Sequence, residues 1–559
     1  MEQDNKEYSS LENLQNSFIS ENTDSYSGRD NAPSDLTLAR AKQSIKKEGD
    51  NLFHENAEND YSERILLTSK GEKTVYDAVS PCNRCGACAA VCPSYKAKMK
   101  ENLSPRGRCQ LTRLLKEYRI KQPDEALKEA ISSCFLCGAC ENLCHAEIPV
   151  REIVLDLRRH YLKQNPGFLR KIALRLKLNH IRLYEFWLRT AFLMLKLRLP
   201  WFAKILGVHS LIGRTPEELR NLVFEPPLKF GTDLLKNYKN PPKHNVKWVY
   251  FSSCETNYVM PKVASATVEL LERHEGEGML AGNVCCGFLS YRMGNIEEAK
   301  AFAKRNIEIF EQLRKDHNEK FIIVTDCSSC AAFLKNYERL FIKDKLQEEV
   351  LLENAETVQV IKSGKEEEDE YFEIGQNESE YKNTPDENQK GEDIANDETR
   401  WRERARAFSA AVRDISEIFS PSDFSKIEKC DEEEGKTVCY QHSCSAIYSQ
   451  KISSQPLQLI RHIAGKCLKD FSGSAECCGG TKGNLPVPQD IKDSSIKRKI
   501  RSIADAQANI VISTDPCCIH AIQSGLKKWY PQANACHLSV YINEAEKNRK
   551  QANIQNNQL

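Results

Sequence analysis

Cys82-Asn83-Arg84-Cys85-Gly86-Ala87-Cys88-Ala89-Ala90-Val91-Cys92 and Cys134-Phe135-Leu136-Cys137-Gly138-Ala139-Cys140-Glu141-Asn142-Leu143-Cys144 are two copies of one pattern, C-x2-C-x2-C-x3-C. This spacing lets three thiolates of a loop bind one cubane cluster while the fourth cysteine points away from it. Two such runs predict two [4Fe–4S] clusters with crossed ligation. We expect one cluster on Cys82, Cys85, Cys88 and Cys144, and the other on Cys134, Cys137, Cys140 and Cys92. Zinc ribbons, the alternative, would leave the third and fourth cysteines of each run unexplained.

Length and composition set the class of protein. A chain of 559 residues is long enough for three or more domains. Its 80 basic and 79 acidic side chains nearly cancel, so the net charge does not favour a nucleic-acid partner. The start, Met1-Glu2-Gln3, lacks the pattern of a signal peptide, and we find no apolar run long enough to cross a membrane. In a cytoplasmic protein, the 23 cysteines indicate metal binding rather than disulfides.

Shifts in composition divide the chain into six parts, and the fold class that they predict is multidomain α+β. A mostly helical dicluster ferredoxin domain is followed by two α/β Cys-Cys-Gly repeat modules. The predicted parts are a disordered N-terminal arm over 1–75, the dicluster ferredoxin domain over 76–160, a basic amphipathic helical connector over 161–240, the first Cys-Cys-Gly module over 241–350, an acidic linker over 351–400 and the second Cys-Cys-Gly module over 401–545.

Two shorter segments carry expectations of their own. Residues 104–108 are expected to form a turn before an amphipathic helix over 109–117, on which Cys109 is a small buried residue rather than a ligand. In the connector, Pro166 and Pro200 are expected to bound helices. Basic residues alternate there with large apolar ones, so the segment from Arg170 to Lys204 either lies on an anionic membrane surface or packs on the cluster domain with a solvated basic face.

The two modules repeat one order of strands and cysteines. Strands predicted over 246–251 and 321–326 lead to Cys254 and to Cys327-Ser328-Ser329-Cys330, with Cys285-Cys286-Gly287 between them. In the second copy, strands over 437–441 and 509–515 lead to Cys444 and Cys517-Cys518, with Cys477-Cys478-Gly479 between them. Loops after the carboxyl ends of parallel strands meet at one edge, so each set of cysteines is expected to form a metal or redox site.

The first set is complete, and the second is not. Cys254, Cys285, Cys286, Cys327 and Cys330 are the expected ligands of the first site. Aligning Thr514-Asp515 with Thr325-Asp326 requires a gap of one residue, which leaves Cys444, Cys477, Cys478 and Cys518 as the second set, with Cys517 or His520 as a candidate fifth ligand. We therefore expect an iron–sulfur cluster in the first module and a simpler cluster, or none, in the second.

Together these motifs resemble the iron–sulfur subunit of glycolate oxidase and of D-lactate dehydrogenase, with anaerobic glycerol-3-phosphate dehydrogenase and heterodisulfide reductase as more distant relatives. The resemblance implies an electron-transfer subunit that receives electrons from an FAD-linked partner oxidising a 2-hydroxy acid and passes them to a quinone or another acceptor. The start of the chain predicts a cytoplasmic protein, and the basic connector adds a predicted peripheral contact on the inner face of the cytoplasmic membrane. The absence of a G-x-G-x-x-G motif and of a P-loop agrees with a flavin held elsewhere, and no catalytic residue is assigned.

Two alternatives remain. In one, the chain is a catalytic disulfide reductase of the heterodisulfide type that uses the Cys-Cys-Gly modules. In the other, the modules are structural and hold zinc or nothing.

Overall fold

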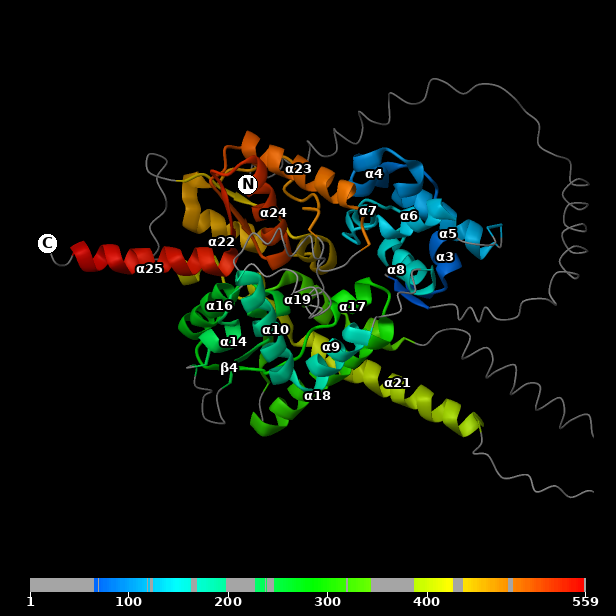
Figure 1. Ribbon diagram of the computed structural model, residues 1–559, viewed down its shortest axis with the longest axis horizontal. Coiled ribbons are helices and arrows are strands. Elements are labelled where there is room, and N and C mark those ends of the chain that lie inside the picture. The colour runs from blue at the N-terminus through cyan, green and yellow to red at the C-terminus, as the bar shows by residue number, and fades with distance from the viewer. Residues whose placement is uncertain are drawn as a thin grey trace, which may run out of the picture. The chain divides into compact units, whose positions relative to one another are not determined.

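The computed structural model describes residues 65–68, 70–117, 119–120, 124–161, 168–197, 227–236, 238, 246–317, 320–342, 387–425, 436–480 and 486–556 (Figure 1). These residues belong to one compact unit, Glu63–Leu559. Residues 1–64 of the predicted arm and 351–386 of the predicted acidic linker lie outside the described residues, as do Pro166, Pro200 and Trp201.

The ferredoxin part is a set of short helices around the two cysteine runs. A hairpin of β1 (Leu66–Thr68) and β2 (Gly71–Lys73) precedes the helices. They are α3 (Val75–Val79), η1 (Ala87–Ala89), α4 (Pro93–Lys98), η2 (Glu101–Leu103), α5 (Pro105–Lys116), α6 (Glu125–Ser132), α7 (Ala139–Asn142) and α8 (Val150–Tyr161). Their shared core contains Leu127, Ile131, Ile153 and Leu157. This arrangement agrees with the predicted helical domain.

Helix α5 begins earlier than expected. The predicted turn over 104–108 is instead the first turn of the helix, because Pro105 stands at its start and the Ser104 hydroxyl accepts the Gly107 N–H at 2.9 Å. A proline at the first helical position after a serine cap favours helix initiation, so the expectation of a turn was wrong. Cys109 is 3% exposed, as expected for a buried residue.

The connector forms α9 (Phe168–Asn179), α10 (Ile181–Lys196) and the short α14 (Gly231–Leu234). Tyr184, Leu188 and Phe192 on one face of α10 pack against Phe230 and Tyr258. Helix α10 is therefore packed, but on Cys254 and Tyr258 of the first module rather than on the cluster domain that this interpretation named. A neighbouring face leaves Phe186 65% and Trp187 42% exposed. No helix among the described residues is long and apolar enough to cross a membrane.

The first Cys-Cys-Gly module contains a parallel sheet in the order β4 (Gly278–Leu280), β3 (Trp248–Tyr250), β5 (Ile322–Thr325) and β6 (Val412–Asp414). The strands β3 and β5 confirm the two strands predicted for this module. Its helices are α15 (Cys254–Tyr258), α16 (Pro261–His274), α17 (Phe288–Arg292), α18 (Ile296–His317), α19 (Ser328–Leu334) and η3 (Tyr337–Phe341).

Two elements that follow residues 343–386, which are not among the described residues, extend this module. Helix α21 (Glu387–Ala410) packs on the first module through Trp401, which stacks on Phe341, and through an ion pair of Glu398 with Lys300 at 2.9 Å. Strand β6 then joins the first sheet by pairing with β5. Helix α21 and strand β6 therefore belong to the first module. The predicted linker over 351–400 and the predicted start of the second module at 401 do not match this arrangement. The apolar contacts of Trp401, Phe408 and Val412 with the first core outweigh the acidic composition of the segment.

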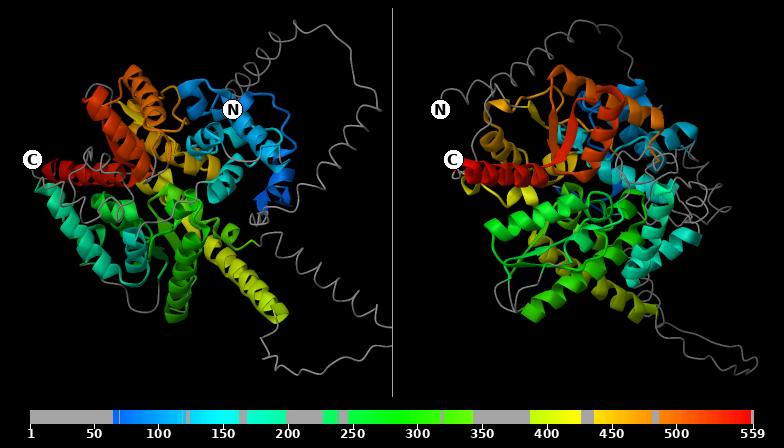
Figure 2. Two further views of the ribbon diagram at one scale, coloured as in Figure 1. Left: turned by 45° about the vertical axis from the view of Figure 1, so that its right-hand side comes forward. Right: turned by 60° about the vertical axis from the view of Figure 1, so that its left-hand side comes forward.

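The second sheet is parallel in the order β7 (Val438–Tyr440), β8 (Ile510–Ser513) and β9 (Asn534–His537). It carries the π-helix η6 (Ser445–Gln450) and helices α22 (Ser454–Ala464), α23 (Gln489–Asp505), α24 (Pro516–Trp529) and α25 (Leu538–Asn556). The C-terminal helix α25, red in Figure 1 and Figure 2, lies against α16 of the first module, and the Thr267 and Ser539 hydroxyls meet at 2.9 Å. One core with residues from both sheets, including Trp248, Tyr440 and Leu538, holds the two modules together.

The ferredoxin part docks on the second module. Lys96 and Lys98, at the end of α4, form ion pairs with Glu476 at 2.7 Å and Asp490 at 2.5 Å. Beneath these ion pairs, Phe135 and Cys137 share an apolar cluster with Cys477, Val487 and Ile491. Because exposed ion pairs contribute little free energy, this apolar cluster is the main source of the docking energy.

Candidate metal centres

The two cysteine loops of the ferredoxin part have the same backbone conformation. Gly86 and Gly138 have φ values of 86° and 82°, and Arg84 and Leu136, two residues earlier in each loop, have 57° and 53°. A Cβ on Gly86 would lie 2.5 Å from the Arg106 guanidinium, and one on Gly138 would lie 2.9 Å from that of Arg151. Each glycine thus allows both the left-handed turn and the close approach of an arginine.

The eight ferredoxin cysteines form two groups. The Cys88 thiol interacts electrostatically with those of Cys82, Cys144 and Cys85, and burial raises the pKa of Cys88 to about 11. A separate cavity of about 20 Å³ is lined by Cys92, Cys134, Cys137 and Cys140. The fold therefore brings the last cysteine of each run to the first three of the other run. This grouping is the one that crossed ligation requires.

The surroundings of the second group fit a bound iron–sulfur cluster. The Leu136 N–H points at the Cys134 sulfur at 3.4 Å, and the Arg108 guanidinium at the Cys92 sulfur at 3.8 Å. Arg108 and Arg158 are each almost fully buried here, and Arg158 donates to the Cys134 carbonyl at 2.6 Å. N–H groups near sulfur and buried cations are the features by which proteins stabilise such clusters. Among the described residues, no three His, Cys, Asp or Glu side chains are grouped so that they could hold a single metal ion.

Cys109 touches the first group without belonging to either run. A hydrogen bond from Cys109 lowers the pKa of Cys82 to about 6. Its burial agrees with the sequence, but its contact with a predicted ligand could not be read from the spacing. Cys109 therefore helps to keep Cys82 in the thiolate form that binds metal.

The first Cys-Cys-Gly module brings its cysteines to one edge of its sheet. The Cys286 and Cys330 sulfurs lie 3.3 Å apart, and hydrogen bonds from Cys254 and Cys286 lower the pKa of Cys285. Cys327 is fully buried in the same apolar core as Cys286 and Cys330. Four of the five predicted cysteines therefore lie together, and Cys327 is buried three residues before one of them, Cys330.

Lys177 is a residue of this site that the sequence analysis missed. It extends from α9, and its ammonium nitrogen lies 5.7 Å from the centre of the Tyr184 ring and 5.8 Å from that of Phe302. Burial opposes its charge, but Cys285 and the neighbouring groups raise the pKa of Lys177 well above its ordinary value. Nothing in the spacing of the connector distinguishes this lysine from the exposed basic residues around it, so no sequence signal could have found it.

The second module gathers the four expected cysteines. The Cys478 and Cys518 sulfurs lie 3.2 Å apart, and Cys477 is hydrogen-bonded to both Cys444 and Cys478. The Gly480 N–H points at the Cys478 sulfur at 3.3 Å. Cys477 also donates a hydrogen bond to Cys137 of the ferredoxin part. The second site is therefore in direct contact with the second ferredoxin group.

Strand register shows how the two modules correspond. Tyr250 pairs with Val324 in the first sheet, and Tyr440 pairs with Ile512 in the second. Counting onward from these pairs, Cys327 matches Asp515 and Cys330 matches Cys518, with no gap. Cys327 and Asp515 are also the N-cap residues of α19 and α24, with φ and ψ of −128° and 104° in one and −118° and 115° in the other.

The predicted gap was therefore wrong. A carboxylate, not a displaced cysteine, occupies the place of the fifth sulfur in the second module. Cys517 matches Ser329, and His520 matches Ala332, so neither stands where the first module has a cysteine. Asp515 is 1% exposed and accepts the Ser329 N–H at 2.8 Å, which uses its carboxylate in the contact between the modules.

Comparison with known families identifies the parts. Residues 78–148 match the 4Fe-4S dicluster domain, and residues 248–335 and 438–523 each match the cysteine-rich domain. The chain therefore carries an iron–sulfur dicluster domain followed by two cysteine-rich domains, in the order that its motifs indicate.

The chain is also similar to several curated proteins. The probable glycolate oxidase iron-sulfur subunit of Bacillus subtilis is 23% identical over 482 residues, which cover 83% of this chain and 93% of the relative. Lactate utilization protein A of Exiguobacterium is 23% identical over 299 residues, 53% of this chain and 97% of the relative. The glycolate oxidase iron-sulfur subunit of Escherichia coli is 26% identical over 275 residues, 47% of this chain and 60% of the relative.

Proposed function

We propose that this chain is the iron–sulfur subunit of a complex in which a partner FAD-linked dehydrogenase oxidises a 2-hydroxy acid, glycolate or D-lactate. Its role is to carry the electrons away from that partner. The names of the similar proteins and the iron–sulfur and cysteine-rich domains of this chain support this function. The observation that carries it is the contact of Cys137 with Cys477, because it joins the ferredoxin part to the second module through sulfur ligands.

The residues divide the work as follows. We assign Cys82, Cys85, Cys88 and Cys144 to one [4Fe–4S] cluster and Cys134, Cys137, Cys140 and Cys92 to a second. When bound, such clusters pass electrons one at a time, which suits the exit path from a flavin that accepts two. Arg108 and Arg158 place positive charge beside the second group, where it stabilises the extra electron on reduction. We assign a further cluster to the five cysteines of the first module and a four-thiolate cluster to the second.

The exposed face of α10 supports a place for this subunit on the inner face of the cytoplasmic membrane, with a quinone as acceptor. Leu183, Phe186 and Trp187 are exposed there, and Arg175 and Arg182 are exposed nearby. Apolar and aromatic side chains next to basic ones suit the headgroup region of an anionic membrane.

The second candidate, a disulfide reductase, is favoured by one observation. The first site holds five cysteines, one more than a cubane cluster needs, and this surplus leaves a thiol for chemistry on sulfur. Reduction of a disulfide substrate by the chain after chemical reduction of its metal groups, with the two electrons drawn from those groups and no hydroxy acid or flavoprotein present, would select this candidate.

The test uses the full chain purified without oxygen. It should contain more than about eight irons, the number in two [4Fe–4S] clusters, and no flavin. It should not oxidise glycolate or D-lactate alone, but adding the partner flavoprotein and substrate should bleach its visible absorption. The matched control is the Cys134→Ser variant, which loses one proposed cluster ligand and leaves the exposed surface unchanged. Stoichiometric FAD in the isolated chain would contradict the proposal.

A further inference from the structure

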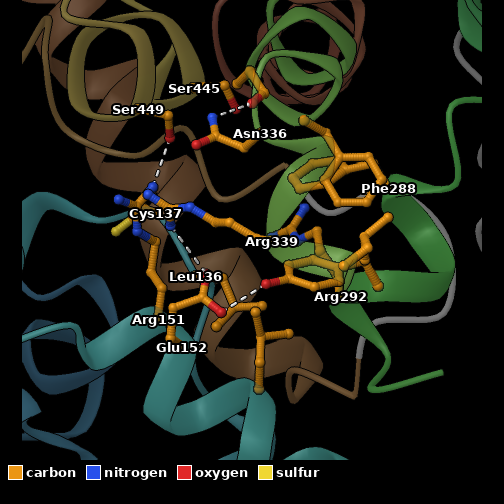
Figure 3. Close-up of a pocket in the computed structure, with 15 residues that line it drawn as sticks. Leu136, Cys137, Arg151, Glu152, Phe288, Arg292, Asn336, Arg339, Ser445 and Ser449 are labelled. Atoms are coloured by element: carbon orange, nitrogen blue, oxygen red, sulfur yellow. Dashed lines mark hydrogen bonds and ion pairs between the residues drawn. The ribbon is translucent and has the colours of Figure 1, made fainter. Parts of the chain in front are cut away.

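A cavity of about 90 Å³, lined by both apolar and charged side chains, lies where the ferredoxin part meets both modules (Figure 3). The second ferredoxin loop and α8 line one side, α17, α19 and η3 of the first module line another, and η6 of the second module closes it. Cys137 belongs to this lining. The cavity is therefore next to the sulfur contact through which we propose that electrons pass.

The lining carries an excess of positive charge. It contains Arg151, Arg292 and Arg339, but Glu152 is its only acidic residue. Figure 3 shows Arg151 and Arg339 reaching into the middle of the cavity, with Glu152 on one side and Ser449 on the other. Arg151 is neutralised by Glu141 at 2.7 Å, and Arg339 is 3.5 Å from Glu152. Two acids thus face three arginines.

Arg292 is the arginine that lacks an acid. It is 8% exposed, donates to the Phe135 carbonyl and lies with its guanidinium 5.3 Å from the centre of the Phe288 ring. Its Nε atom is buried and has no hydrogen-bond partner, and no carboxylate pairs with it among the described residues. A nearly buried guanidinium charge without an acid beside it is unfavourable, so the cavity that Arg292 lines is complementary to a ligand that brings a negatively charged oxygen.

We propose that this cavity binds a small carboxylate anion. Arginine donates in a planar fork that matches a carboxylate, and the Ser449 hydroxyl and Asn336 amide add polar groups to the same lining. The size favours a small ligand: a cavity of about 150 Å³ holds benzene, so one of about 90 Å³ suits an acid of a few carbons better than a quinone ring.

Two sources can supply such an anion. One source is the reaction of the partner, which offers the hydroxy acid or its oxo acid. The other is an abundant carboxylate such as acetate. A negative charge beside Cys137 should also lower the reduction potential of the group that Cys137 holds, because it disfavours an added electron. This last consequence rests on the proposed function, whereas binding itself does not.

The test is calorimetric titration of the anaerobically purified full chain with acetate, glycolate and D-lactate at constant ionic strength. We expect saturable binding of one anion. Arg339→Gln should weaken it about tenfold or more, the loss of one charge-assisted hydrogen-bonded pair. Arg339 is suited to this change because its side chain is 35% exposed and its removal leaves no cavity in the core. The matched control is Arg406→Gln. Arg406 is an exposed arginine of α21 outside the cavity, and it pairs with Glu338, the neighbour of Arg339 on η3.

Tighter binding of glycolate or D-lactate than of acetate would assign the site to hydroxy acids, and equal binding would assign it to carboxylates in general. Saturable binding that is equally strong in wild type and Arg339→Gln overturns the proposal, as does the absence of saturable binding. Iron content and electron uptake from the flavoprotein are measured on the same samples. A failure of binding with both intact therefore refutes the anion site and leaves the electron-transfer function standing.

Discussion

The Cys477 thiol of the second module donates a hydrogen bond to Cys137 of the second ferredoxin run. The ion pairs of Lys96 and Lys98 with Glu476 and Asp490 hold the two parts together on the same side. Electron transfer falls off steeply with distance, so two metal groups whose ligands touch should exchange electrons directly. The second module, not the more complete first one, therefore has a cysteine in contact with a cysteine of the ferredoxin part.

The first prediction concerns this contact. If both groups bind clusters, reduced protein should show an EPR signal broadened by magnetic interaction between them. Cys477→Ser should remove the broadening and leave the iron of the ferredoxin part in place. Cys286→Ser, which alters the first module, is the control and should preserve the broadening. An unchanged spectrum in Cys477→Ser would show that the two sites are not coupled.

A second prediction tests crossed ligation. Cys92 lines the cavity of Cys134, Cys137 and Cys140, and the Arg108 guanidinium points at its sulfur. Cys92→Ser should therefore damage the cluster of the second run and spare the one on Cys82, Cys85 and Cys88, although Cys92 lies nearer to these in sequence. EPR of the reduced variant separates the two clusters. Loss of the signal from the first cluster instead would refute the assignment.

The elements that the sequence predicted correctly are those whose signal is local. An apolar run such as Phe321–Val324 predicts a strand from its own residues, and cysteines after strand ends meet at one edge because parallel strands share a direction. Strand β6 was missed because it has three residues, one of them Arg413, and becomes a strand only by pairing with β5. Lys177 was missed because the folding of the connector, not its spacing, brings it to Cys285.

The alignment error at Asp515 has a different cause. Matching Thr-Asp to Thr-Asp is the natural choice when only letters are compared. Strand register instead places Asp515 opposite Cys327, where it caps α24 and accepts the Ser329 N–H. A residue that replaces a ligand and takes over a structural hydrogen bond cannot be recognised without the partner module in view.

A third prediction follows from this correspondence. Asp515→Cys places a fifth cysteine where the first module has one, and it should increase the iron bound per chain if the missing ligand limits the second site. The reference pair is Cys330→Ser and Cys518→Ser, of which the first should remove more iron and more electron-transfer activity. Equal losses in that pair would show that the second site is as complete as the first.

A fourth prediction concerns stability and pH. His537 is fully buried, and its Nδ1 accepts the Ser539 N–H at 3.1 Å while Nε2 donates to the Asp326 carbonyl at 2.8 Å. Burial lowers the pKa of His537 to about 4, so the unfolded chain binds a proton that the folded chain does not. The free energy of unfolding should fall as pH decreases from the ordinary value of about 6.5 toward 4, by up to about 3 kcal/mol.

Denaturant titrations of the metal-free chain at several pH values between 5 and 7 measure this effect. His537→Gln, which keeps an amide donor, should lose the corresponding part of the slope. His462, only partly buried and bonded to the Phe424 carbonyl, provides the control variant His462→Gln. An identical pH dependence in His537→Gln and the wild type would show that another group titrates.

The last prediction separates two roles that the basic connector combines. Arg175 and Arg182 are exposed, and Phe186 and Trp187 project from the open face of α10. Lys177, in contrast, points at the cysteines of the first module, so it does not belong to the surface that we propose lies on the membrane. Each basic residue near an anionic membrane contributes about 1 kcal/mol, so Arg175→Glu with Arg182→Glu should weaken binding to anionic vesicles at least about tenfold.

The same measurement on Lys177→Gln gives the opposite pattern. Vesicle binding should be unchanged, while the reduction potential of the group in the first module should fall, because a positive charge that stabilises the reduced form is gone. Sedimentation with vesicles and EPR-monitored redox titration report the two effects separately. Undiminished vesicle binding in the Arg175→Glu, Arg182→Glu variant would mean that the exposed face of α10 does not bind the membrane, whereas a loss of vesicle binding in Lys177→Gln would show that this lysine faces outward.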